Sequence, residues 1–160
     1  MSRPLLAITM GDPAGVGPET IVGAWSDPRV HEWCRAVVIG HPEFLRRAVD
    51  LLGSRCEVVP VEDVAEARSS TECIPCLPCG STVALDVPPA TIDPRSGEAA
   101  YAAVVRAAEL AIARRVDGIV TAPLHKAALW QAGHHYPGHT ELLAELCGVQ
   151  DFAMMLYLGP

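Results

Sequence analysis

The chain has 160 residues, of which 50% are hydrophobic and 19% are charged, a balance typical of one folded domain and not of a disordered segment. Its formal net charge is -7 and it has no basic cluster, which argues against nucleic acid or an anionic membrane surface as a partner. The apolar run near the N-terminus is too short for a signal peptide, and no stretch approaches the length of a membrane span. We therefore expect a cytoplasmic protein.

Six apolar runs predict strands. In chain order they are Leu5–Thr9, Ala36–Gly40, Cys56–Val61, Thr82–Asp86, Asp117–Ala122 and Phe152–Leu158. Several of these runs are continuously apolar and do not alternate with polar residues, so we expect them to be buried on both faces of a sheet. With helical segments between them, the sequence predicts the α/β class, with a mostly parallel, doubly wound sheet.

Five segments have the composition and periodicity of helices. They are Pro18–Trp25, Pro42–Leu52, Gly97–Arg115, Lys126–Gln131 and Thr140–Cys147. The longest is rich in alanine, with Ser96 as a candidate N-cap and Arg114 and Arg115 near its negative end. Residues 69–94 are rich in Ser, Thr, Cys and Pro and show no helical period, so we expect an extended segment there, with the strand at 82–86 as its only regular element.

The first strand runs into the glycine-rich sequence MGDPAGVGPE. Gly11, Gly15 and Gly17 can adopt positive φ and let the backbone approach a ligand, and Pro18 suits the first turn of a helix. Such a loop offers backbone N–H groups to a phosphorylated or carboxylated small molecule, but a glycine-rich turn needed only for packing fits equally well. The spacing matches neither the P-loop nor the dinucleotide-binding fingerprint. Asp12 could orient an ammonium group of a substrate or simply make the turn.

Two later groups of polar residues lie at the ends of predicted elements. Thr121, His125 and Lys126 come after a predicted strand, where open α/β sheets bind ligands. Lys126 could supply a positive charge to a phosphate or transfer a proton, although a solvated helix lysine is the ordinary alternative. His139 and Thr140 begin a predicted helix, where a ring nitrogen and a hydroxyl suit an anionic group; the alternative is that Thr140 caps the helix and His139 packs beside it.

Cysteines and histidines raise the question of a metal site. Cys73, Cys76 and Cys79 have metal-like C-x-x-C spacing, but the next cysteine along the chain, Cys147, is remote, so we favour reduced thiols in a structural loop over a zinc site. His134, His135 and His139 are separated by Pro137 and Gly138, which break any helix that would align them. We therefore predict no metal ligand in this chain.

Three motifs occur in a characteristic order: TMGDPAGVGPE, VTAPLHKAALWQAG from Val120 to Gly133, and YPGHTELLAEL from Tyr136 to Leu146. In combination they resemble the 4-hydroxythreonine-4-phosphate dehydrogenase family of pyridoxal phosphate biosynthesis, which includes relatives acting on phosphorylated threonate or erythronate. The similarity covers nearly all of the chain but about the first half of a typical member. We therefore interpret residues 1–160 as the N-terminal part of a dehydrogenase whose C-terminal half is absent.

The resemblance implies an isocitrate and isopropylmalate dehydrogenase-like architecture, with two α/β domains flanking a cleft, and a homodimer when complete; this chain would be one incomplete lobe. It implies NAD-dependent oxidation and decarboxylation of 4-phosphohydroxy-L-threonine to 3-amino-2-oxopropyl phosphate, assisted by a divalent metal such as zinc, magnesium or cobalt. In the family a His-Thr pair contacts substrate, which assigns that role to His139 and Thr140. The metal ligands and most NAD contacts would lie in the absent half.

Two alternatives to this function stay open. The substrate could be 4-phospho-threonate or 4-phospho-erythronate, since nothing in this half distinguishes an amino group from a hydroxyl group at C2. The chain could also be a truncated, non-catalytic binding module. Under any of these functions, Asp12, Gly15, Gly17, Thr121, His125 and Lys126 are candidates to line the site beside His139 and Thr140.

Overall fold

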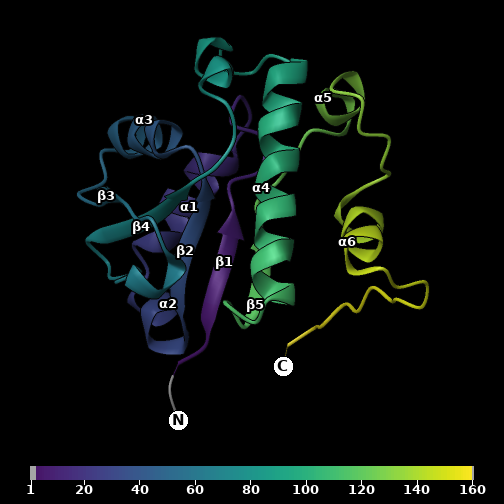
Figure 1. Ribbon diagram of the computed structural model, residues 1–160. Coiled ribbons are helices and arrows are strands. Elements are labelled where there is room, and N and C mark those ends of the chain that lie inside the picture. The colour runs from purple at the N-terminus through teal and green to yellow at the C-terminus, as the bar shows by residue number, and fades with distance from the viewer. Residues whose placement is uncertain (1–2, 160) are drawn as a thin grey trace.

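The computed structural model describes residues 3–159, which form a five-stranded sheet covered by helices (Figure 1). The strands are β1 (Leu5–Thr9), β2 (Arg35–Gly40), β3 (Glu57–Pro60), β4 (Cys73–Pro78) and β5 (Gly118–Thr121). Their order across the sheet is β3-β4-β2-β1-β5, and all four pairings are parallel. The predicted α/β class with a mostly parallel sheet is therefore confirmed.

Helices cover both faces of this sheet. They are α1 (Gly17–Trp25), α2 (Pro28–Trp33), α3 (Pro42–Leu52), α4 (Pro94–Ile112), α5 (Lys126–Gln131) and α6 (His139–Cys147), with short 3-10 helices η1 (Val64–Glu66) and η2 (Thr82–Asp86). One core cluster joins Trp25 of α1 and Phe44 of α3 to the sheet, and a second joins Ala103 and Ala107 of α4 to Leu5 and its neighbours. The sheet is thus doubly wound, as its apolar strands predict.

The alanine-rich α4 is the central helix of its face, and α5 and α6 pack against it (Figure 1). Its small side chains let the helices approach closely. A Cβ atom added at Gly97 would lie 2.1 Å from the carbonyl oxygen of Ala128, so α5 rests directly on the α4 backbone at that point. The helix begins earlier than expected, because Asp93 is its N-cap and accepts from the N–H of Arg95. Ser96, the expected cap, instead donates its hydroxyl to the carbonyl oxygen of Asp93.

The strand within residues 69–94 lies earlier in the chain than predicted. Thr82–Asp86 forms η2, and the strand is β4, Cys73–Pro78, which lies inside the sheet between β3 and β2. Pro75 obscures this strand in the sequence, because proline lacks the N–H of a ladder bond. The structure accommodates it because pairing with β2 begins only at Cys76. The short helix α2, which is capped by Asp27, was not predicted from the sequence.

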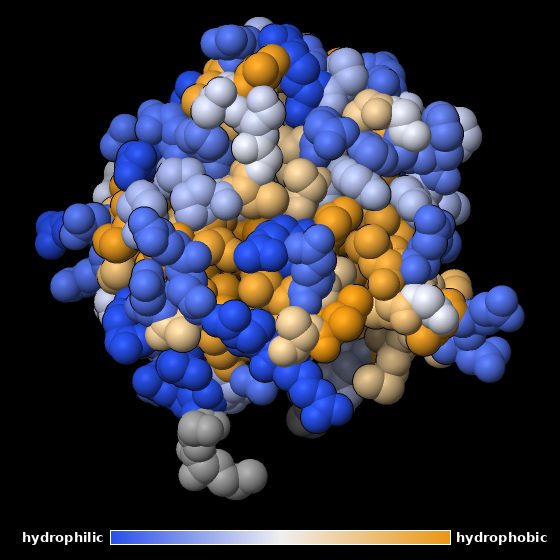
Figure 2. Space-filling model, viewed as in Figure 1, coloured by the Kyte–Doolittle hydropathy of each residue, from blue (hydrophilic) through white to orange (hydrophobic). Residues whose placement is uncertain are grey.

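The apolar segment Phe152–Leu158 is not a strand, contrary to expectation. It has no regular structure, and the side chains from Met154 to Leu158 are 77% to 93% exposed. A strand forms only where a neighbour offers backbone groups, and this segment pairs with none of the described strands. Figure 2 shows hydrophobic residues gathered on the visible face between α4 and α6. Among residues 3–159, no helix is long and apolar enough to cross a membrane.

Candidate functional site

The glycine-rich loop and the loop after β5 leave the same edge of the sheet. Because β1 and β5 are parallel neighbours, their last residues, Thr9 and Thr121, lie opposite each other. The N–H of Asp12 donates to the carbonyl oxygen of Pro123 at 2.9 Å, which joins the two loops. The carboxyl ends of the strands therefore bring both sequence motifs to one edge, the usual position of a ligand site in an open α/β sheet.

Packing explains two of the three loop glycines. Gly11 has a φ of +72°, and a Cβ there would lie 2.2 Å from the carbonyl oxygen of Pro123. A Cβ at Gly17 would lie 2.2 Å from the carbonyl oxygen of Met10. Asp12 is buried, and its carboxylate accepts from the N–H of Ala14, as in a turn. These residues shape the loop, and among residues 3–159 no hydrogen bond joins them to the later polar candidates.

Gly15 has more space and lines a cavity of about 250 Å³ between the loop and α3. Glu19 lies in the same wall, and its Oε2 is inaccessible and has no hydrogen-bond partner among residues 3–159. The lining of this cavity includes neither Lys126 nor His139. The cavity beside the loop is therefore shared with α3 and not with the second group of candidates.

His139 is the first residue of α6 and is half-buried. Gly138 is the N-cap, and no side chain caps this end, so Thr140 does not have the capping role that we considered. The Nε2 atom of His139 is inaccessible and has no hydrogen-bond partner within the described part of the chain. Burial lowers the pKa of His139 below its ordinary value, which favours a neutral ring at neutral pH. A neutral imidazole with an unused nitrogen suits hydrogen bonding to a ligand.

Lys126 approaches this helix start. A Cβ built at Gly138 would lie 3.9 Å from Cε of Lys126, so the lysine side chain lies beside the first turn of α6. The structure thus brings Lys126 near the segment that carries His139 and Thr140. His125 is different: its Nδ1 accepts from the N–H of Ala128 at 3.4 Å and caps α5.

The loop between α5 and α6 is attached to α4 by aromatic and charged side chains, of which sequence analysis had considered only His134, as a possible metal ligand. Nε2 of His134 lies 2.6 Å from a carboxylate oxygen of Glu98, and the His134 ring stacks on Tyr101 at 3.5 Å. Tyr136 donates its hydroxyl to Glu145 at 3.0 Å. These contacts hold the start of α6 in place. No spacing rule in the sequence links Glu98 to His134, so the pair was not predictable.

The three histidines have separate surroundings. His134 pairs with Glu98, His135 lies edge-on to Trp130 with ring centroids 4.5 Å apart, and His139 begins α6. Within residues 3–159, no group of three or more His, Cys, Asp or Glu side chains is arranged to hold a metal ion. The residues present therefore do not fit the divalent metal that the resemblance implies.

The three clustered cysteines lie in and just after β4, so the expectation of a loop is wrong. Successive side chains of a strand alternate between faces, and a spacing of three residues therefore places neighbouring cysteines on opposite faces. Cys76 belongs to the core on the α1 side, whereas Cys79 packs against the core on the α4 side. Burial raises the pKa of the Cys76 thiol to about 12, so this thiol stays protonated and unreactive.

We expect iodoacetamide to modify the exposed Cys147 and to spare Cys76 in the native protein at pH 8, because only the thiolate reacts and Cys76 is both buried and protonated. Mass spectrometry of the digested protein measures both sites. In urea, Cys76 should become as reactive as Cys147. Equal labelling of the two residues in the native protein would contradict the burial of β4.

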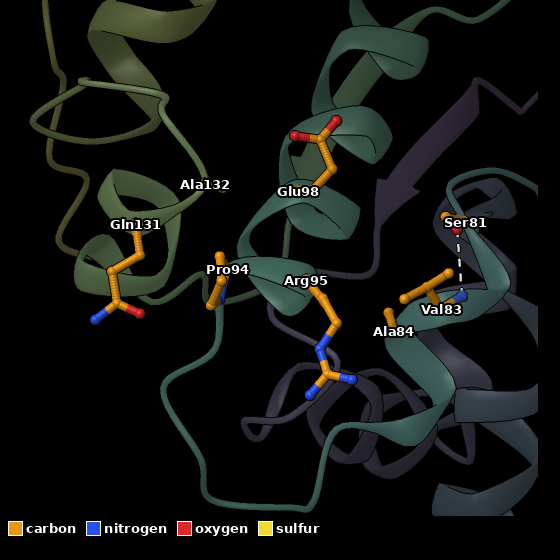
Figure 3. Close-up of a pocket in the computed structure, with 8 residues that line it drawn as sticks. All are labelled: Ser81, Val83, Ala84, Pro94, Arg95, Glu98, Gln131 and Ala132. Carbon is orange, nitrogen blue, oxygen red and sulfur yellow. Dashed lines mark hydrogen bonds between the residues drawn. The ribbon is translucent and has the colours of Figure 1, made fainter.

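The cavity drawn in Figure 3 has a volume of about 380 Å³ and lies between η2, the start of α4 and the end of α5. Its charged side chains are already paired. Arg95 contacts Asp93 at 2.7 Å, and Glu98 contacts His134. We therefore retain the segment from Gly138 to Thr140, with Lys126, as the candidate site.

Comparison with known proteins assigns the chain to a family. Residues 32–159 match the family model described as "Pyridoxal phosphate biosynthetic protein PdxA". The chain is 45% identical to the 4-hydroxythreonine-4-phosphate dehydrogenase of Trichlorobacter lovleyi over 155 residues. This alignment covers 96% of this chain and 46% of that protein. It is 44% identical to the D-threonate 4-phosphate dehydrogenase of Salmonella typhimurium over 160 residues. That alignment covers 98% of this chain and 48% of the Salmonella protein.

The fold agrees with these relatives. A crystal structure of a 4-hydroxythreonine-4-phosphate dehydrogenase from Klebsiella pneumoniae superposes with a TM-score of 0.90 at 38% identity, covering 97% of this chain and 48% of that chain. The chain thus spans about half the length of the curated relatives it matches. Since the family model matches most of the sequence, the chain belongs to the PdxA family of pyridoxal phosphate biosynthetic proteins, whose curated relatives here are dehydrogenases.

Proposed function

We propose that this chain is the substrate-binding half of an NAD-dependent dehydrogenase that oxidises and decarboxylates 4-phosphohydroxy-L-threonine. One observation carries the site assignment: within the described part of the chain, His139 begins α6 with a buried Nε2 that has no hydrogen-bond partner, and Lys126 lies beside the preceding residue, Gly138. An acidic group of the substrate would bind at this start of α6. The reaction and the substrate come from the relatives' names, 4-hydroxythreonine-4-phosphate dehydrogenase among them.

Each residue has a distinct role in this proposal. His139, neutral because burial lowers its pKa, donates an N–H to a phosphate or carboxylate oxygen, and Thr140 adds its hydroxyl. Lys126 supplies the positive charge that a neutral imidazole lacks. A local cation matters here because the chain as a whole has a net charge of -7, which repels an anionic substrate.

The proposed NAD and divalent metal would be bound largely outside these residues. The described histidines and cysteines do not fit a metal, so no step of the reaction is assigned to a metal ligand of this chain. We propose that the length present in the relatives and not matched here supplies those contacts. Residues 3–159 would then contribute one wall of a cleft that closes only with the second half, and the complete protein would form a homodimer.

D-threonate 4-phosphate is the second candidate substrate, because relatives of both names share nearly equal identity with this chain, 45% and 44%. The two substrates differ at C2, and no described residue has been placed against that carbon. The ratio of kcat/KM for the two substrates, measured with this chain joined to the second half of the Trichlorobacter lovleyi relative, distinguishes them.

Replacing His139 with alanine tests the site. In the joined protein, we expect His139→Ala to weaken substrate binding by about 1 to 3 kcal/mol, the loss of a hydrogen bond to a charged group, or roughly 5- to 150-fold. Affinity for NAD should stay unchanged. The control is His135→Ala, which removes an exposed ring near Trp130. Isothermal titration calorimetry measures both ligands, and equal substrate affinity of the two variants would refute the assignment of His139.

A further inference from the structure

The cavity beside Gly15 has no part in the proposed substrate site, because its lining includes neither Lys126 nor His139. The glycine-rich loop and the start of α1 form one wall of this cavity, α3 forms the second, and the segment after η2 forms the third. Its volume of about 250 Å³ lies just below the range of about 300 to 1,000 Å³ in which drug-sized ligands bind. It therefore suits a smaller molecule.

The third wall is tied to the glycine-rich loop by a hydrogen bond. The N–H of Ala90 donates to the carbonyl oxygen of Ala14 at 2.7 Å, and Ala90 has a φ of +58°. Residues other than glycine seldom adopt this left-handed conformation, and proteins keep such strain mainly where the surrounding structure or a ligand site requires it. The bond holds Val87 and Pro89, which come shortly before Ala90, against the cavity.

Two side chains of opposite charge line the cavity, and neither is paired with an opposite charge among residues 3–159. Glu19 is half-buried, and its Oε2 has no hydrogen-bond partner in that range. The Nη1 atom of Arg47 donates to the carbonyl oxygen of Leu85 at 3.1 Å, and the guanidinium lies 5.4 Å from the centre of the Phe44 ring. These contacts fix the guanidinium at the rim and leave most of its N–H groups available to a ligand.

Most of the remaining lining is apolar. It includes Phe44, Ala48 and Leu51 of α3, and Val87 and Pro89 after η2. A ligand that complements the whole cavity therefore has a positive group for Glu19, a negative group for Arg47 and an apolar body. An amino acid with an aliphatic body has these three parts.

We propose that the cavity beside Gly15 is a binding site for such a small zwitterion, with its ammonium group against Glu19 and its carboxylate against Arg47. The phosphorylated substrate is a poor occupant, because Arg47 is the one cation of this lining among the described residues, and a phosphate would add a second anionic group. This site is distinct from the start of α6 and does not depend on which substrate binds there.

The proposal also gives Gly15 a role. Neither its backbone nor its packing requires glycine, since it lacks a positive φ and an added Cβ would lie 3.5 Å from atoms of Asp12, an ordinary contact. A residue without a side chain leaves this wall of the cavity open to a ligand. Gly11 and Gly17, by contrast, are required by packing.

Nuclear magnetic resonance titrations of the isotope-labelled 160-residue chain test the proposal. The probes are L-leucine and its isomer 6-aminohexanoate, which differ in the distance between their two charges. We expect at least one of them to bind saturably, with a Kd of about 1 mM or tighter, and to shift the amide resonances around Gly15 and Ala48. Analogues of that probe that lack the ammonium group or the carboxylate should bind at least about fivefold more weakly. The absence of saturable binding by both isomers, or equal binding of both analogues, would overturn the proposal.

Substitutions locate the site in the chain. Glu19→Gln and Arg47→Met should each weaken binding of the probe by at least about fivefold. The matched controls are Glu32→Gln, at an exposed position of α2, and Arg46→Met, which neighbours Arg47 but does not line the cavity. Both controls should bind the probe as the original chain does. Equal weakening in the variants and their controls, or resonance shifts confined to the start of α6, would refute the site. Loss of binding in the joined protein would show that the second half fills the cavity and would refute it as well.

Discussion

No NADH is expected to form when the 160-residue chain is incubated with NAD, 4-phosphohydroxy-L-threonine and zinc, magnesium or cobalt. The chain spans about half the length of its dehydrogenase relatives, and residues 3–159 contain no group of side chains suited to a metal ion. Without a second domain, nothing holds a nicotinamide within hydride-transfer distance of a substrate at His139. The loss should be complete within the sensitivity of an assay of absorbance at the NADH band.

The control for this experiment is the same chain co-expressed with the second half of the Trichlorobacter lovleyi relative. Activity should return in the purified complex and should fall again when Lys126 is replaced by methionine, which keeps the length of the side chain and removes its charge. Turnover by the 160-residue chain alone would contradict the proposal that it is half of a site. It would also require chemistry from histidines or cysteines that the structure keeps apart.

Replacing Gly97 with alanine should destabilise the chain by about 3 kcal/mol or more, and lower the melting temperature by about 10 °C. A Cβ at this position would lie 2.1 Å from the carbonyl oxygen and 2.4 Å from the carbonyl carbon of Ala128. These are backbone atoms, so no side-chain rotation relieves the clash. α5 would have to move away from α4, and Lys126, the first residue of α5, would move with it.

Gly23→Ala is the matched control, because it is the same substitution within a helix. Gly23 lies in α1, where an added Cβ meets nothing within 4 Å. Alanine has the higher helix propensity, so this variant should be more stable by about 0.5 to 1 kcal/mol. Thermal and urea unfolding of the two variants measure the contrast. Equal stability of the two would show that the close contact between α4 and α5 does not exist in solution.

The Gly97 variant and the Lys126 variant both concern one physical feature, the attachment of α5 and α6 to α4. Gly97 sets the distance between α4 and α5, and the Glu98–His134 contact, one residue further along α4, anchors the loop that leads to His139. The candidate site is therefore built on helices that depend on α4 for their position. We therefore expect a substitution in α4 to change the positions of Lys126 and His139 even where the altered residue contacts neither of them.

The sequence alone determined the features that depend on local composition. The continuous apolar runs located β1, β2, β3 and β5 to within one or two residues, because a strand buried on both faces requires such a run wherever it lies. Periodicity and proline positions located α3 and α5 at their observed bounds. The order of three motifs identified the family, which the family model confirms.

The tertiary structure decided what depends on a partner far away in the chain. β4 is a strand despite Pro75, because β2 begins to pair with it only beyond that residue, whereas the apolar Phe152–Leu158 is not a strand, because no neighbour pairs with it. Gly11 and Gly17 are glycines because carbonyl oxygens lie against them, a contact that no local spacing encodes. The candidate site likewise depends on tertiary packing: Lys126 lies beside Gly138, the residue before His139, because α5 and α6 pack on the same helix, α4.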